Sequence, residues 1–162
     1  MIKHTIEPFY NVNSEILILG SMPSVKSRIE GFYYAHPQNR FWKVLSLVYK
    51  ESIGETILEK KSFLNKHHIA LFDVIASCDI LGSSDASIKN VKINNISKII
   101  KETHVKKIYL NGKKASTLYN RYLKDKLNIE SICLPSTSPA NASYSLLDLV
   151  NAYQVLNNSN EM

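Results

Sequence analysis

EILILGSMPS, residues 15–24, joins a short apolar run to a glycine, a proline and two serines. A brief apolar run that is bounded by turn-forming residues is typical of a strand buried on both faces of a sheet. Three further stretches have the same form, at residues 69–75, 106–111 and 129–134. Together with residues 15–21, these stretches predict four buried strands.

Helix-like patterns follow these strands along the chain. Residues 41–48 place apolar side chains at the i, i+3, i+4, i+7 spacing of an amphipathic helix. The same spacing recurs within residues 115–123 and 146–153, and more weakly within residues 55–67. Strands that alternate with helices predict an α/β fold, a three-layer α/β/α sandwich around a central, mainly parallel sheet of about four strands. We expect one domain over residues 1–162, with a frayed tail at 157–162.

The composition is that of an ordinary globular domain, with 162 residues of which 44% are hydrophobic and 21% charged. The apolar runs are too short to cross a bilayer, and the N-terminus, MIKHTIEPFYN, lacks the apolar segment of a secretory signal. We therefore expect a cytoplasmic protein without membrane contact. Cys78 and Cys133 are too few for a disulfide framework and too isolated for a metal cluster, so we expect no metal and no cofactor.

The net charge is positive, with a formal value of +6 and a pI near 9.2. Clustered lysine and arginine side chains gain affinity for nucleic acids by displacing counterions from phosphate groups. The charge therefore favours a polyanion as partner. A lysine-rich surface that only keeps the protein in solution is the alternative.

Polar sequence follows each predicted strand. GSMPS occupies residues 20–24, Asp73 ends the second run, NGK occupies 111–113 and PSTSPAN occupies 135–141. In an open parallel sheet, ligands bind beyond the carboxyl ends of the strands, where the following loops converge. We therefore expect the functional site at this edge.

YYAHPQNRFW, residues 33–42, combines aromatic side chains with a polar turn. A core segment rarely contains His36-Pro37-Gln38-Asn39, and a solvent loop rarely carries so many aromatic rings. The stretch therefore predicts a site, with Phe41 and Trp42 as core anchors of its loop. Asparagine is also a favoured N-cap, so capping of the helix that follows is an alternative role for Asn39.

GSMPS (20–24), YYAHPQNRFWKVL (33–45) and LPSTSPANASYSLLDLVNAY (134–153) together resemble the motifs of the uracil-DNA glycosylase superfamily. The resemblance covers nearly the whole chain. In that superfamily the first motif activates the attacking water, and the last grips the DNA backbone and runs into a C-terminal helix. The resemblance implies DNA containing deaminated bases as the partner.

Two branches of the superfamily share parts of this pattern. AHPxNRFWKV and LVxAY also look like the mismatch-specific uracil glycosylases, whose first motif carries an asparagine where this chain has Met22. GS-x-P, YYAHPxNxFW and PSTSPAN instead resemble the hypoxanthine-DNA glycosylase branch, or family 6, in which the asparagine of HPxN is catalytic. The resemblance therefore makes Asn39 the catalytic residue.

The resemblance also assigns residues to the flipped base. Tyr34 corresponds to the stacking aromatic, with Tyr33 as the alternative. A carboxylate at Asp73 either accepts the N1–H of hypoxanthine or is structural, and Ser21 either bonds the base or is merely small. The expected base-binding residues are Tyr34, Ser21, Met22, Pro23, His36 and Asp73.

The loops that follow the first and fourth strands are expected to bind the DNA backbone. Backbone amides in serine-rich loops and nearby lysines bind phosphate groups without reading sequence. The expected DNA-binding residues are Ser24, Lys26, Lys113, Ser136, Thr137, Ser138, Ala140 and Asn141.

An asparagine can orient water through its carbonyl and its amide, but it is not a strong base. Such a site suits a base that already leaves well, such as hypoxanthine or uracil. We therefore expect a monomeric, monofunctional DNA glycosylase of base excision repair that hydrolyses the N-glycosidic bond of deoxyinosine. A uracil- or mismatch-directed glycosylase and a non-catalytic module that binds DNA lesions are the alternatives.

Overall fold

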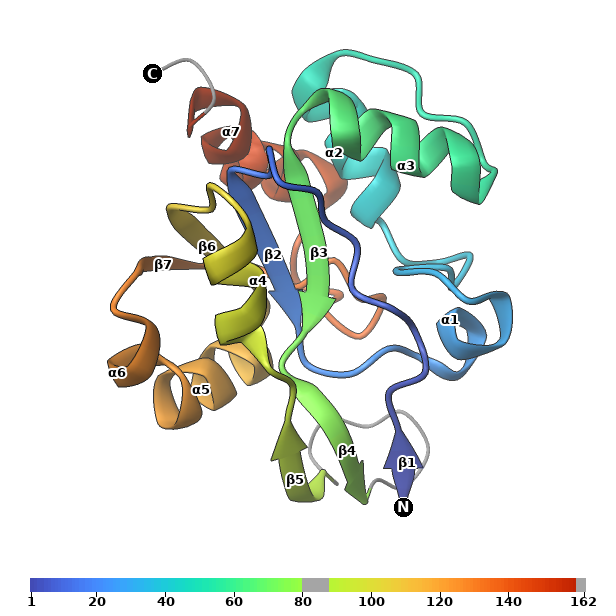
Figure 1. Cartoon of the computed structure of the whole chain (residues 1–162). Helices are drawn as coiled ribbons and strands as arrows, with labels where there is room; N and C mark the ends of the chain where they lie inside the picture. The colour runs from blue at the N-terminus through green and yellow to red at the C-terminus, as the bar shows by residue number, and fades with distance from the viewer. Residues whose placement is uncertain (80–87, 160–162) are drawn as a thin grey trace.

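The computed structural model describes residues 1–79 and 88–159. Its centre is a sheet of four parallel strands in the order β3-β2-β6-β7 (Figure 1). The strands are β2 Ile16–Gly20, β3 Ile69–Asp73, β6 Lys107–Asn111 and β7 Glu130–Leu134. Each lies inside one of the four predicted runs, which confirms the mainly parallel sheet of an α/β fold.

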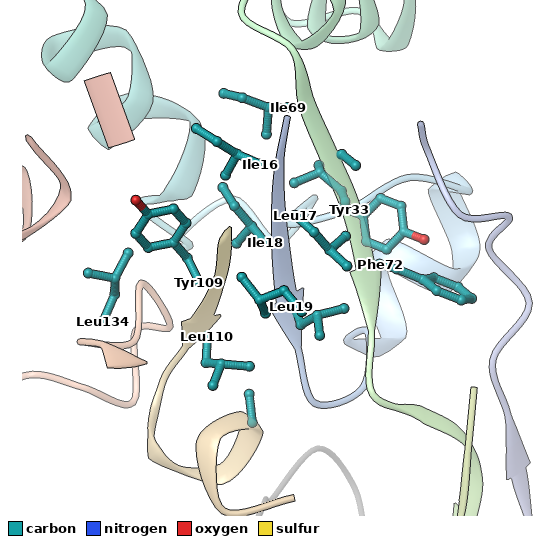
Figure 2. Packing of buried hydrophobic residues seen from close by; sticks show 14 of the residues in the cluster. Ile16, Leu17, Ile18, Leu19, Tyr33, Ile69, Phe72, Tyr109, Leu110 and Leu134 are labelled. Carbon is teal, nitrogen blue, oxygen red and sulfur yellow. The ribbon is translucent and has the colours of Figure 1, made fainter. Parts of the chain in front are cut away.

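The apolar side chains of β2 explain its central place in the sheet. Residues 16–19 are between 0% and 2% exposed. Figure 2 shows that Ile18 projects to the side of Tyr109, whereas Leu17 projects to the opposite side, toward Tyr33. Complete burial of one such side chain stabilises the fold by roughly 1.5–3 kcal/mol. Both faces of the sheet are therefore covered, as a layered α/β fold requires.

The predicted helical stretches correspond to four of the described helices. The helices in the described part of the chain are α1 Val25–Glu30, α2 Phe41–Tyr49, α3 Ile57–Lys66, α4 Ile96–Glu102, α5 Lys113–Tyr122, α6 Lys124–Leu127 and α7 Leu146–Ser159. The weak stripe of residues 55–67 forms α3 because a capping box of Thr56 and Glu59 starts it. α7 continues through Ser159, so residues 157–159 are helical where a frayed tail was expected, and residues 160–162 lie outside the described residues. No described helix combines the length and the hydropathy needed to span a membrane.

A second, antiparallel sheet was not predicted. It has the order β1-β4-β5, with β1 at Ile2–Lys3, β4 at Ile75–Asp79 and β5 at Lys89–Ile93. β1 is only two residues long and β5 is largely exposed, so neither shows a hydrophobic pattern. Only Val74 separates β3 from β4, so the predicted strand at 69–75 covers β3 and ends at the first residue of β4. This small sheet places the N-terminus beside the far end of β4 and His4, which follows β1, near the carboxyl end of β3 (Figure 1).

Candidate active site

A pocket of about 580 Å³ lies at the carboxyl edge of the four-stranded sheet. Gly20, Asp73 and Asn111, the last residues of β2, β3 and β6, all line it. The predicted site residues in its lining are Ser21, Met22, Pro23, Ser24, Tyr34, His36, Asn39, Asp73, Ser136, Thr137, Ser138 and Ala140. Lys26, Lys113 and Asn141 are not among its lining residues. Segments far apart in the sequence thus converge on one cavity.

Asn39 is held in this pocket by its side-chain oxygen. Oδ1 accepts a hydrogen bond from the Thr137 hydroxyl at 2.8 Å and from the Phe41 amide at 3.0 Å. Thr137 is fully buried, and its own amide donates to Asn111 Oδ1 at 3.0 Å. Asn111 Nδ2 in turn donates to Thr137 Oγ1 at 3.1 Å. This network ties the end of β6 and the loop after β7 to the start of α2.

The direction of these hydrogen bonds sets what Asn39 offers to a ligand. The Thr137 amide is a donor, so the atom of Asn111 that faces it must be the acceptor Oδ1. The other atom of the Asn111 side-chain amide, Nδ2, then faces the Thr137 hydroxyl and donates to it. The hydroxyl proton is then directed to Asn39 Oδ1, whose two lone pairs are both used. The Nδ2 amide of Asn39 therefore remains as a hydrogen-bond donor. A carbonyl contact from Asn39 to water, which the sequence left open, would need one of these bonds to break.

Asn39 also stabilises the start of α2. The flanking residue is Arg40, whose side chain makes no capping hydrogen bond, and Asn39 Oδ1 accepts from the amide of Phe41, the first helical residue. The capping role and a chemical role use different atoms of the same side chain. They are therefore compatible.

Tyr34 has a backbone conformation that is unusual for an aromatic residue. Its φ of +57° lies in the left-handed region, which side chains other than glycine adopt at an energetic cost. Its ring stacks on Phe41, with the centroids 3.9 Å apart and an interplanar angle of 20°. Burial, and then the negative charge of Asp73, raise the pKa of the Tyr34 phenol. Tyr34 therefore keeps a neutral hydroxyl that is buried near Gly20, and Phe41 supports one face of its ring.

Asp73 is 3% exposed although it lines the pocket. One carboxylate oxygen, Oδ2, lies 2.7 Å from Nε2 of His4. The other, Oδ1, lies so near Gly20 that a Cβ added to Gly20 would be 2.5 Å from it. Gly20 and Asp73 are register partners in the sheet, so a side chain at position 20 would collide with the carboxylate. The glycine of the GSMPS motif is therefore needed for the close approach of Asp73.

The loop of residues 135–141 satisfies much of its own hydrogen bonding. The Ser136 hydroxyl accepts from the Ser138 amide at 3.1 Å, and the Ser138 hydroxyl accepts from the Ala140 amide at 3.2 Å. Asn141 Nδ2 donates to the Ser136 carbonyl at 3.0 Å. A phosphate contact from the backbone amide of Ser138 or Ala140 would therefore compete with bonds that hold the loop. The buried Thr137 instead supports Asn39.

Two further elements carry residues expected to contact DNA. Ser24 is the N-cap of α1, and its hydroxyl accepts from the Ser27 amide at 3.1 Å. Lys26 Nζ lies 3.2 Å from Glu30 on the exposed side of the same helix. Lys113 is the exposed first residue of α5. Both lysines therefore lie outside the pocket. At these positions the only DNA contact open to them would be with the backbone.

Arg40 clamps the loop before α7 onto the start of α2. Its guanidinium donates to the backbone carbonyls of Asn141 at 3.0 Å, Ser138 at 3.5 Å and Tyr144. The planar guanidinium can reach several carbonyls at once, which a lysine ammonium on its flexible stem cannot do in the same geometry. The residue after Asn39 therefore holds the loop that contains Thr137.

Replacing Arg40 with alanine is expected to lower the free energy of unfolding by about 1–3 kcal/mol, since hydrogen bonds from a charged donor are lost. Amide hydrogen exchange should become faster in residues 138–144 and not in β2. Arg121→Ala, at an exposed position on α5 where the guanidinium lies over the Tyr122 ring, is the matched control and should change stability by less than about 1 kcal/mol. Unchanged exchange in the loop of the Arg40 variant would contradict the clamp.

Several residues around the pocket were not assigned a role from the sequence. Arg28 of α1 lines it, Asn111 orients Thr137, and His4 bonds Asp73 from the segment after β1. Asn111 ends a predicted strand, and that position was the only signal of its role. Nothing in the local sequence marks His4. In the described part of the chain, no group of three or more His, Cys, Asp or Glu side chains could hold a metal ion.

The comparisons with known proteins agree with one another. The family model of the uracil DNA glycosylase superfamily matches residues 7–158. A protein of Methanosarcina acetivorans named hypoxanthine DNA glycosylase is 35% identical over 147 residues, which are 90% of this chain and 92% of that protein. A protein of the same name from Methanosarcina barkeri is 34% identical over 144 residues, covering 87% and 89% of the two chains. A solution NMR structure from Methanosarcina acetivorans, provisionally named a uracil DNA glycosylase, superposes with a TM-score of 0.79 at 32% identity and covers 97% of this chain and 99% of that chain.

Proposed function

The chain belongs to the uracil DNA glycosylase superfamily, and from this premise we propose that it is a monofunctional DNA glycosylase that releases hypoxanthine from deoxyinosine in DNA. The superfamily predicted from the three motifs is confirmed. The two Methanosarcina relatives named hypoxanthine DNA glycosylase support this choice of base.

One observation within the pocket supports hypoxanthine over adenine. Asn39 Nδ2 is a donor, and the carboxylate of Asp73 is an acceptor in the same pocket. Hypoxanthine presents a C6 carbonyl beside an N1–H, so an amide donor and a carboxylate acceptor complement its edge. Adenine presents an amino group and an unprotonated N1 at the same positions, so the polarity is reversed. Leaving such a buried polar group unpaired costs about 1–3 kcal/mol.

The reaction then needs little proton transfer from the protein. The electron pair of the C1′–N9 bond leaves with the base, a water oxygen bonds to C1′, and the water proton passes to solvent or to the released base. Fixed hydrogen-bond donors stabilise negative charge as it develops, and those present before the reaction cost no reorganisation. The Asn39 amide is such a donor. The described residues that line the pocket include no lysine, which favours direct hydrolysis over a Schiff-base lyase step.

Tyr34→Ala is expected to weaken binding to inosine-containing DNA by about 1–3 kcal/mol, the usual contribution of a base stacked on an aromatic ring. Binding to undamaged DNA should change much less, because phosphate contacts dominate it. Tyr34→Phe is the matched control, since it keeps the ring on Phe41 and removes only the hydroxyl. Fluorescence anisotropy with the two DNAs measures both affinities. An equal loss for both DNAs would show that Tyr34 does not contact the flipped base.

The finer features of the proposal are a monomer that acts in the cytoplasm, needs no metal and grips the DNA backbone through the loops at residues 24–28 and 135–142. The chain carries a formal charge of +6, which supports binding to a polyanion. Because the proposed reaction uses no metal, activity should persist in a chelator such as EDTA. Loss of activity in EDTA that one divalent metal restores would overturn the metal-free part of this proposal.

The proposed function is tested by incubating the protein with duplexes that carry deoxyinosine, deoxyuridine or only normal bases. Abasic sites, revealed by cleavage in alkali, are expected mainly with deoxyinosine. Faster cleavage with deoxyuridine would make the protein a uracil-directed glycosylase. Binding to deoxyinosine without any product under single-turnover conditions would make it a non-catalytic lesion-binding module.

A further inference from the structure

His4 and Asp73 form a buried pair beside the pocket. His4 Nε2 lies 2.7 Å from Asp73 Oδ2, and the two side chains are only 3% and 4% exposed. The residues are 69 positions apart in the sequence and meet because β1 pairs with β4, which directly follows β3. An ionisable pair with so little exposure is costly to bury unless its geometry is well satisfied.

The surroundings of His4 hold its ring in one place. The backbone amide of His4 donates to the carbonyl of Ala76 in β4 at 2.8 Å. The ring packs edge-on against Phe72 at 5.0 Å between centroids and is tilted toward Tyr33 at 6.2 Å. The imidazole therefore approaches Asp73 from a fixed direction. The small antiparallel sheet supplies this contact to the pocket edge of the large sheet (Figure 1).

The two oxygens of Asp73 face different partners. Oδ2 is bonded to His4, whereas Oδ1 lies over Gly20, which lines the pocket together with Tyr34 and Asp73 itself. An ionised carboxylate has no proton to donate, so the His4 nitrogen that faces it must carry the proton. With that proton on His4, both oxygens of Asp73 act as acceptors.

We propose that His4 is a positioning residue for base selection, which donates Nε2–H to Asp73 Oδ2 and so holds Asp73 as a hydrogen-bond acceptor with Oδ1 available to the base. This inference rests on the proposed function, and it adds a residue that acts through Asp73 without touching the DNA. A protonated Asp73 would be a donor and would suit the unprotonated N1 of adenine. The ionised form instead accepts an N–H and therefore suits hypoxanthine.

A double-mutant cycle on single-turnover release of hypoxanthine tests the proposal. His4→Phe keeps the ring packing on Phe72 and removes the donor, so release should slow by about tenfold to a hundredfold, the scale of a hydrogen bond to a charged group. His4→Gln, whose amide can donate near the position of Nε2, should recover most of this loss. In an Asp73→Asn background, His4→Phe should change the rate by no more than about twofold, because its effect passes through Asp73.

A purely structural role for His4 gives a different pattern. His4→Phe would then lower the melting temperature, and its effect on the rate would persist undiminished in the Asp73→Asn background. That result overturns the proposal. If His4→Phe does not fold, His4→Gln and His4→Asn make the same comparison. The glutamine amide keeps a donor near Asp73, whereas the asparagine amide is one methylene shorter and does not reach it.

An activity-independent measurement separates this proposal from the proposed function. Nitrogen-15 NMR of the imidazole in the wild-type protein should show a proton on Nε2 of His4, and Asp73→Ala should abolish the shift that marks its hydrogen bond. An unprotonated Nε2 would overturn the proposal, because Asp73 would then be the donor. If the wild-type protein releases uracil and not hypoxanthine, the proposed function fails, and the same cycle measured with uracil still decides the role of His4.

Discussion

Asn39→Ala is expected to slow single-turnover release of hypoxanthine by about a hundredfold or more, the scale at which removing one fixed hydrogen-bond donor acts on a transition state. Binding to inosine-containing DNA should change much less, because phosphate contacts carry most of the affinity. The variant also loses the acceptor of the Phe41 amide and of the Thr137 hydroxyl, so some loss of stability is expected as well. Quench-flow rates and a thermal melt measure the two effects.

Asn39→Asp is the control that separates capping from chemistry. Aspartate keeps an oxygen for the Phe41 amide and the Thr137 hydroxyl, so the start of α2 and the fold should be preserved. It replaces the Nδ2 donor with a second acceptor, so release should be nearly as slow as in the alanine variant. If Asn39→Asp released hypoxanthine at the normal rate, the Nδ2 donor would not be needed for the reaction. Asn39 would then act only through its hydrogen bonds to Phe41 and Thr137.

Gly20→Ala is expected to have an effect of similar size for a different reason. The new Cβ would lie 2.5 Å from Asp73 Oδ1 and 3.3 Å from the Tyr34 hydroxyl, so at least the carboxylate must move. A displacement of about 1 Å in a catalytic site can cost roughly a hundredfold in rate. We therefore expect release to slow by about that factor, with DNA binding largely retained.

Gly31→Ala is the matched control for this substitution. Gly31 has a φ of +79° and no atoms within 4 Å of an added Cβ, so alanine there meets backbone strain but no neighbour. It should cost about 1 kcal/mol of stability and leave the rate of release unchanged. If Gly20→Ala also released hypoxanthine at the normal rate, Asp73 could move aside freely, and its proposed contact with the base would be wrong.

The positions that can be predicted from the sequence are those whose signal is local. The four strands of the large sheet were predicted because each contains a short apolar run, although β7 at the sheet edge buries only Leu134. The polar residues after the strands were placed at one edge because parallel strands end together. Asn39 and Tyr34 were predicted because their motif is contiguous. β1 and β5 were not, because a two-residue strand and a largely exposed strand carry no hydrophobic pattern.

The sequence by itself therefore determined the parallel sheet, the edge that carries the pocket and the superfamily, all of which depend on neighbouring residues or on short motifs. Only the tertiary structure decided which atom of Asn39 faces a ligand, because the Thr137 hydroxyl that bonds Oδ1 comes from 98 positions away. It likewise decided that His4 holds Asp73 across 69 positions. Such contacts depend on the register of strands and on the packing of loops, and a hydrogen bond between distant residues leaves no periodic pattern in the chain that makes it.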